Sequence, residues 1–191
     1  MGEVIDKAAK IVRNPDKSQE EMPADPIIVV RGPSDRLFII DHHHGARAWL
    51  LAGHSIGVCR IQKQLSTEDP SEFWLQLERS HKIHLEDENG RPITHDRLPT
   101  ALETMPDDPY RTLAWLVRKN QGFCRADMPQ KEFAEFQWAD FFRSNLNPSD
   151  VEWTAKLIDK AVKLAESPQA KAQPGYVGDK PPTYVCHDEN D

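Results

Sequence analysis

The stretch between residues 26 and 53 constrains the fold more than any other part of the sequence. Pro26–Val30 is a continuous β-branched run, which predicts a strand buried on both faces. The turn-forming residues Gly32–Asp35 separate it from a second apolar strand, Leu37–Ile40. Asp41 can cap a helix that begins directly after this strand. The sequence therefore predicts two strands and a helix in close succession.

This helix is expected to end at Gly53, because glycine readily adopts the backbone conformation that follows a helix. Ala46, Trp49 and Leu50 share one of its faces and are expected in the core. The segment 55–65 is predicted to form a third strand, with Ile56, Val58 and Ile61 as its apolar positions.

The rest of the chain is expected to be mainly helical, apart from a polar loop over 16–25. Apolar periodicity and capping residues predict further helices over residues 4–12, 71–80, 108–122, 131–145 and 149–166. The last of these begins with the capping box Ser149–Glu152. We therefore predict an α+β fold in which a small mixed sheet with helices is followed by a helical C-terminal extension.

The expected organisation has three parts. Residues 1–68 form the sheet-and-helix core, residues 69–166 a helical extension packed on the same core, and residues 167–191 a mobile, proline-rich acidic tail.

The composition limits the classes of function. The net charge is -7, from 24 basic and 31 acidic residues, so any contact with nucleic acid must be local rather than a property of the whole surface. The chain has no run of 18 apolar residues and no apolar signal core near its start, which predicts a cytoplasmic protein without a membrane partner. Its three widely spaced cysteines are expected to be free thiols, with neither a disulfide framework nor a cysteine-based zinc site.

Asp41 and three consecutive histidines stand where the second strand turns into the helix. A helix N-terminus exposes unpaired N–H groups and a partial positive charge, and phosphates bind there readily. Histidine side chains add donors that can become cationic near neutral pH. The residues predicted to bind phosphate here are His42, His43, His44, Gly45 and Arg47.

Two other interpretations apply to the same residues. Imidazole and carboxylate also bind transition metals, so Asp41 and His43 are candidate metal ligands. Consecutive residues fan out around a helix, however, and the remaining ligands would have to come from elsewhere in the chain. In the third interpretation the segment is a structural turn, in which Asp41 caps the helix and a histidine satisfies a backbone carbonyl.

The strand followed by Asp41–His44, Ala46–Ala48 and Leu51–Gly53 resembles the ParB-like nuclease group of the ParB and sulfiredoxin superfamily. Residues 107–111, Gly122-Phe123 and 135–141 also resemble that group, as do Ser167-Pro168 and 173–176. The resemblance covers most of the chain, from Gly2 to about Tyr176. The Gly-Glu-Arg-Arg sequence of ParB partition proteins is absent, and His42–His44 with Arg47 occupy the corresponding stretch.

The resemblance implies a ParB/sulfiredoxin-like fold and metal-assisted cleavage of DNA, with Mg²⁺ or Mn²⁺ as the cation. Asp41, His43 and His44 would be the catalytic residues, and Arg47 would clamp the phosphate. Arg111 is a further candidate phosphate ligand, because a cation in the first turn of a helix opposes the dipole unless an anion accompanies it.

Two alternatives involve a different function class. One is an ATPase or a small-molecule phosphotransferase, which would bind ATP or another nucleotide. The other is a non-catalytic plasmid or phage regulatory module, which would bind a protein partner. The sequence specifies no oligomeric state, and the expected partner in the leading interpretation is the phosphate of a nucleotide or of DNA.

Overall fold

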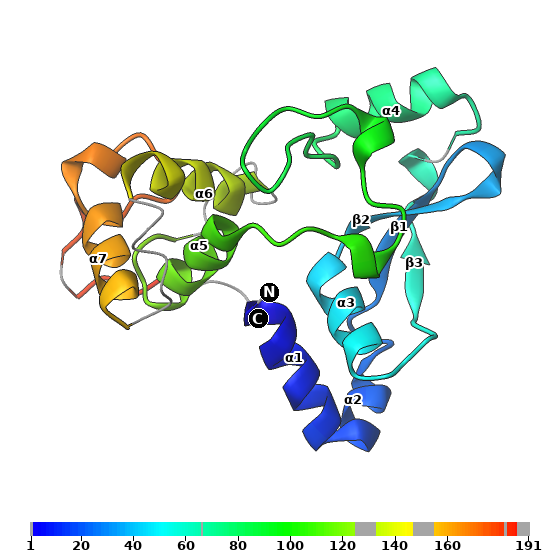
Figure 1. Ribbon diagram of the computed structural model, residues 1–191, viewed down its shortest axis with the longest axis horizontal. Coiled ribbons are helices and arrows are strands. Elements are labelled where there is room, and N and C mark those ends of the chain that lie inside the picture. The colour runs from blue at the N-terminus through cyan, green and yellow to red at the C-terminus, as the bar shows by residue number, and fades with distance from the viewer. Residues whose placement is uncertain (1, 66, 125–132, 147–154, 182, 187–191) are drawn as a thin grey trace. The chain divides into compact units, whose positions relative to one another are not determined.

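The computed structural model describes residues 2–65, 67–124, 133–146, 155–181 and 183–186 (Figure 1). The chain forms two compact units, Met1–Asp107 and Asp108–Asp191.

A three-stranded mixed sheet lies at the centre of the first unit. Its strands are β1 (Ile27–Arg31), β2 (Leu37–Asp41) and β3 (Cys59–Ile61), in the order β2-β1-β3. β2 pairs with β1 antiparallel and β3 pairs with β1 parallel. The central strand carries the buried Val29 and Val30, as its β-branched run predicts. The sheet thus fixes the end of β2, where the histidines follow.

Two helices pack side by side, and the second of them also contacts β1 (Figure 1). They are α1 (Gly2–Arg13) and α3 (His43–Leu51). Their interface is a cluster in which Val4, Ala8 and Ile11 meet Ala48, with partly buried residues of α3 around them. Ala48 is fully buried and Leu50 only partly, so the helix turns a slightly different face to the core than the pattern predicts.

A second cluster joins the sheet to α4 (Pro70–Arg79), whose N-cap Asp69 accepts a hydrogen bond from the Glu72 backbone N–H. Phe73 and Leu77 of this helix are buried against Val30. The ring centroids of Phe38 and Phe73 are 4.8 Å apart. The short helices of this unit are η1 (Pro33–Asp35), η2 (Lys63–Leu65), η3 (His95–Arg97) and η4 (Leu102–Thr104).

Two predicted elements of the first unit were wrong. The polar segment after Asn14 is in part a helix, α2 (Pro15–Glu21), because a proline that ends one helix is also favoured at the first position of the next. The third strand covers only Cys59–Ile61. Ile56, which the alternation placed in the core, is 84% exposed, because the sheet pairing begins only at Cys59.

The second unit is helical and contains α5 (Pro109–Lys119), α6 (Ala134–Asn145), α7 (Ala155–Ala165) and the short η7 (Pro168–Ala170). Asp108 caps α5, the helix expected over 108–122, by accepting from the Tyr110 backbone N–H. The aromatic residues of α6 form the core, where Trp138 stacks on Phe123 with ring centroids 4.5 Å apart. The predicted capping box Ser149–Glu152 lies outside the described residues.

The C-terminal segment contacts this core. Trp138 Nε1 donates to the Pro174 carbonyl at 2.8 Å, and Phe123 pairs with Tyr176 in an isolated β-bridge. Cys124 and Cys186 form a disulfide, so the expectation of three free thiols was wrong, and only Cys59 is free among the described residues. The two cysteines are separated by 62 residues, and packing rather than sequence proximity brings them together.

The predicted fold class is confirmed, with a small mixed sheet and helices followed by a helical part. None of the helices in the described ranges has the length and apolar character needed to cross a membrane.

Reduction of the Cys124–Cys186 disulfide is expected to destabilise the second unit. The bond joins cysteines 62 residues apart, and the conformational entropy that the unfolded chain gains without it lowers the stability by about 4 kcal/mol. Chemical denaturation of Cys186→Ser should show this decrease, whereas Cys59→Ser should unfold like the wild type. If three thiols can be titrated after the protein has been purified and unfolded without a reductant, the disulfide is absent.

Candidate functional site

A single left-handed residue connects β2 to α3. His42 is the N-cap of α3 and has φ 63° and ψ 28°. Residues other than Gly, Asn, Asp and His seldom adopt this backbone conformation. Asp41 Oδ1 accepts a hydrogen bond from the His42 backbone N–H at 2.8 Å. His42 Nδ1 lies 3.1 Å from the Pro26 carbonyl oxygen and 3.0 Å from Asp25 Oδ1. Because both partners are acceptors, Nδ1 carries the proton.

Asp41 therefore does not cap the helix as predicted. Its carboxylate holds the turn through His42, and no side chain caps α3. The first intrahelical bond runs from the Ala46 N–H to the His42 carbonyl. Among the residues that the structure describes, none accepts a hydrogen bond from the backbone N–H groups of His43, His44 or Gly45. The start of α3 thus presents three N–H groups and the positive end of its dipole.

His43 is directed back toward the sheet. Its Nε2 lies 3.1 Å from the Ile39 carbonyl oxygen, so the neutral ring donates from Nε2. Burial lowers the pKa of His43, and the neighbouring His44 and His42 add to this effect, while the Ile39 carbonyl and Asp41 oppose it. His43 is therefore a neutral ring that anchors the helix start to β2.

His44 pairs with a residue that the sequence did not single out. Its Nδ1 lies 2.7 Å from Glu3 Oε2, while Glu3 Oε1 lies 3.0 Å from Lys7 Nζ. The Glu3 side chain is only 14% exposed. Burial alone would raise the pKa of Glu3, but the hydrogen bond and charge of His44, together with Lys7, lower it well below the usual range. Glu3 is thus an ionised carboxylate against the His44 ring.

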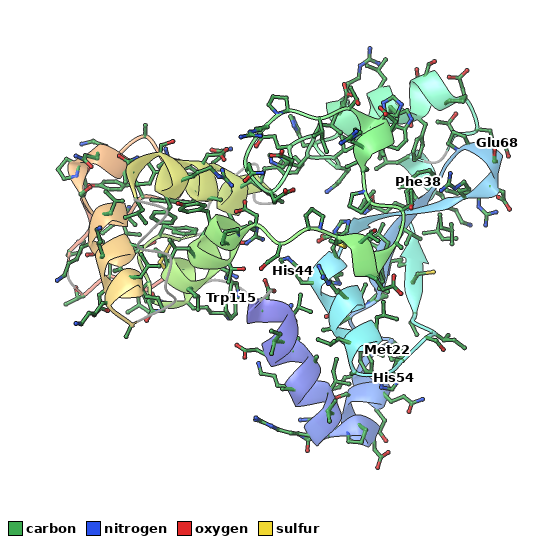
Figure 2. All side chains as sticks on the ribbon, viewed as in Figure 1. Met22, Phe38, His44, His54, Glu68 and Trp115 are labelled. Carbon is green, nitrogen blue, oxygen red and sulfur yellow. A yellow bond between two sulfur atoms is a disulfide. The ribbon has the colours of Figure 1, made fainter. Side chains whose placement is uncertain are left out.

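The Glu3–His44 contact joins the first turns of α1 and α3. The two helices therefore run in the same direction with their N-terminal ends together. His44 lies at the upper end of α3 in Figure 2, and His54 lies beyond the lower end. No local pattern identifies Glu3 as a partner of His44, since the two are far apart in sequence.

Gly45 and Arg47 have different surroundings. A Cβ at Gly45 would meet no atom within 4 Å, so this glycine leaves open space at the helix start. Gly45 also lines a small hollow together with His42, Asp25 and Trp49. Arg47 Nη1 donates to the Met105 carbonyl at 2.6 Å, which ties α3 to the segment after η4.

The predicted metal ligands do not fit a metal ion. Asp41 is engaged with the His42 N–H, and His43 turns toward the Ile39 carbonyl. In the described part of the chain, no group of three or more His, Cys, Asp or Glu side chains has the arrangement of a metal site. We therefore assign no chemistry to a protein-bound metal.

Arg111 lies in the second unit, whereas the three histidines lie in the first. It forms an ion pair with Glu135 of α6, whose other oxygen accepts from Arg118 Nε at 2.6 Å. Arg143 pairs with Asp140, as well as with Asp108 at 2.7 Å. Glu135 and Asp140 thus both have arginine partners.

Residues 1–144 match the protein family described as "Putative ParB-like nuclease". A solved structure, that of protein Atu1540 from Agrobacterium tumefaciens, is similar with a TM-score of 0.70 and 28% sequence identity. The similarity covers 87% of each chain. A comparison with curated proteins gave no match.

Acidification is expected to destabilise the protein through His43. Because its folded pKa is lowered, the ring stays neutral in the folded state and takes up its proton on unfolding. The contribution is complete above the ordinary pKa of 6.5 and is lost as the pH falls below it. His43→Gln keeps a donor for the Ile39 carbonyl and should flatten this part of the pH dependence in urea unfolding. Identical pH dependence in variant and wild type would contradict the assignment.

Proposed function

We propose that this chain, which belongs to the ParB-like nuclease family matched over residues 1–144, binds the phosphate of a nucleotide or nucleic acid at the start of α3 and hydrolyses a phosphodiester there. The observation that carries the proposal is the group of N–H donors of His43, His44 and Gly45, which have no acceptor among the described residues. A phosphate oxygen would supply the missing acceptors.

The surroundings of these donors favour a phosphate over other ligands. The left-handed turn at His42 keeps a capping side chain away from them, and Gly45 leaves space for a group to approach. The dipole of α3 adds a positive potential that stabilises negative charge, including the charge that develops on phosphate during hydrolysis. Of the guanidinium donors of Arg47, one binds Met105, and we assign the others to the phosphate.

The charge of the protein favours a small substrate. With a net charge of -7, the chain would repel a long duplex over most of its surface. Nucleotides and short single strands need only one or two neutralised phosphates. We therefore propose a short single-stranded DNA or a nucleotide diester as the substrate. Any cation would enter the site bound to the phosphates of this substrate.

Gly45→Asp is expected to weaken phosphate binding without unfolding the protein. An aspartate in the first turn favours the helix dipole, so the melting temperature should be unchanged or higher. The same carboxylate would compete for the N–H donors and repel the ligand. Calorimetric titration with a short single-stranded oligonucleotide should give a Kd at least ~10-fold weaker, equivalent to about 1.4 kcal/mol.

Gly45→Ala is the matched control, because a Cβ at this position meets no atom within 4 Å. It should bind the oligonucleotide like the wild type. If Gly45→Asp binds as tightly as Gly45→Ala, the phosphate does not sit at the start of α3. If the wild type binds the oligonucleotide but never cleaves it, in EDTA or in Mg²⁺, the proposed hydrolysis is wrong.

A further inference from the structure

The pair formed by Glu3 and His44 has the geometry of a carboxylate-oriented histidine. Glu3 Oε2 accepts from His44 Nδ1 at 2.7 Å, so Nδ1 keeps its proton and Nε2 is the ring nitrogen that can accept one. The His44 side chain is 37% exposed, whereas its carboxylate partner is largely buried. A ring fixed on one side and open on the other is suited to taking a proton from a bound group.

We propose that Glu3 is a positioning residue and His44 the general base of the hydrolysis. This inference rests on the proposed function, because His44 is itself one of the residues whose backbone N–H would bind the phosphate. The ring and the N–H donors therefore belong to the same turn of α3.

The reaction consumes one water molecule and balances without a further reactant. Water transfers a proton to His44 Nε2 while its oxygen forms a bond to phosphorus. The bond from phosphorus to the leaving oxygen breaks, and the electron pair stays on that oxygen. The imidazolium then gives its proton to the leaving oxygen, or to solvent where the leaving group needs none.

The neighbouring pair of His42 and Asp25 is less suited to this role. Asp25 is 78% exposed, so its charge is screened by water and its side chain is weakly fixed. His42 also bonds to the Pro26 carbonyl, which makes it part of the turn. His43 points toward the Ile39 carbonyl, and no described carboxylate forms an ion pair with its ring. Among these three histidines, His44 is thus the one that is paired with a buried carboxylate.

The contacts of Glu3 explain why it can act through His44. The first turns of both helices meet at its carboxylate, where the positive ends of two dipoles stabilise a negative charge. Lys7 Nζ holds the second carboxylate oxygen at 3.0 Å, so Oε2 is left to His44. An ionised Glu3 in turn stabilises the imidazolium that forms during proton transfer.

The test compares Glu3→Gln with the wild type. Glutamine can still accept from His44 Nδ1–H, so the fold and the ring position should be kept while the charge is lost. With bis(4-nitrophenyl) phosphate as the probe, kcat should fall ~10-fold or more for Glu3→Gln and ~100-fold for His44→Gln. The oligonucleotide Kd should stay within about two-fold or become tighter, because a nearby negative charge is removed.

Asp6→Asn is the matched control, since Asp6 is exposed on the same helix and the charge change is the same. Its kcat should equal that of the wild type. Because 4-nitrophenolate leaves without a proton, a loss of kcat with this probe identifies a base rather than an acid.

A ¹⁵N spectrum of the histidine side chains tests the pair independently of turnover. When the His44 ring of the wild type is neutral, its proton should be on Nδ1. A proton on Nε2, or a kcat for Glu3→Gln equal to that of Asp6→Asn, would overturn the inference while leaving the proposed function intact. A wild type that binds the oligonucleotide and hydrolyses neither probe would overturn both.

Discussion

The turn at His42 is the constraint on which the rest of the site depends. One left-handed residue carries the chain from the edge strand β2 into α3 without a capping side chain. Such a conformation costs free energy and persists only where the surroundings hold it. Here three contacts hold it, through the Asp41 carboxylate, the Pro26 carbonyl and Asp25. The helix start is thereby left with open N–H donors.

The three histidines contact different segments because their side chains point in different directions at the start of the helix. His42 bonds to the segment before β1, His43 to the carbonyl of Ile39 in β2, and His44 to Glu3 in α1. A run of identical side chains therefore does not converge on one ligand. The run ties the helix start to three neighbouring segments, and it leaves the backbone donors at the centre of the candidate site.

Local sequence signals predicted the parts of the fold that short-range chemistry decides. The β-branched run 27–30 became the central strand, and Asp108-Pro109 became the start of α5. The loop expected over 16–25 was in part a helix, because the proline at position 15 can begin a helix as well as end one. The alternation around Ile56 indicated a longer strand than its pairing with β1 supports.

The sequence singled out Asp41–His44, but it did not indicate which residues their side chains contact. Glu3 lies in the first turn of an amphipathic helix and has no local feature that links it to His44. The Cys124–Cys186 bond likewise depends on how a distant segment packs on the α5–α6 core. Pairings between residues far apart in the chain follow from the tertiary fold, and a single sequence contains little information about them.

The proposed site stands or falls with phosphate binding by the backbone N–H groups at the start of α3. The most direct test is a titration of the ¹⁵N-labelled protein with inorganic phosphate and then with a short single-stranded oligonucleotide, followed by amide NMR. The account predicts that the largest shifts occur at the amides of His43, His44 and Gly45, with the same saturation curve at all three. Saturable shifts elsewhere, with these amides unmoved, would contradict it.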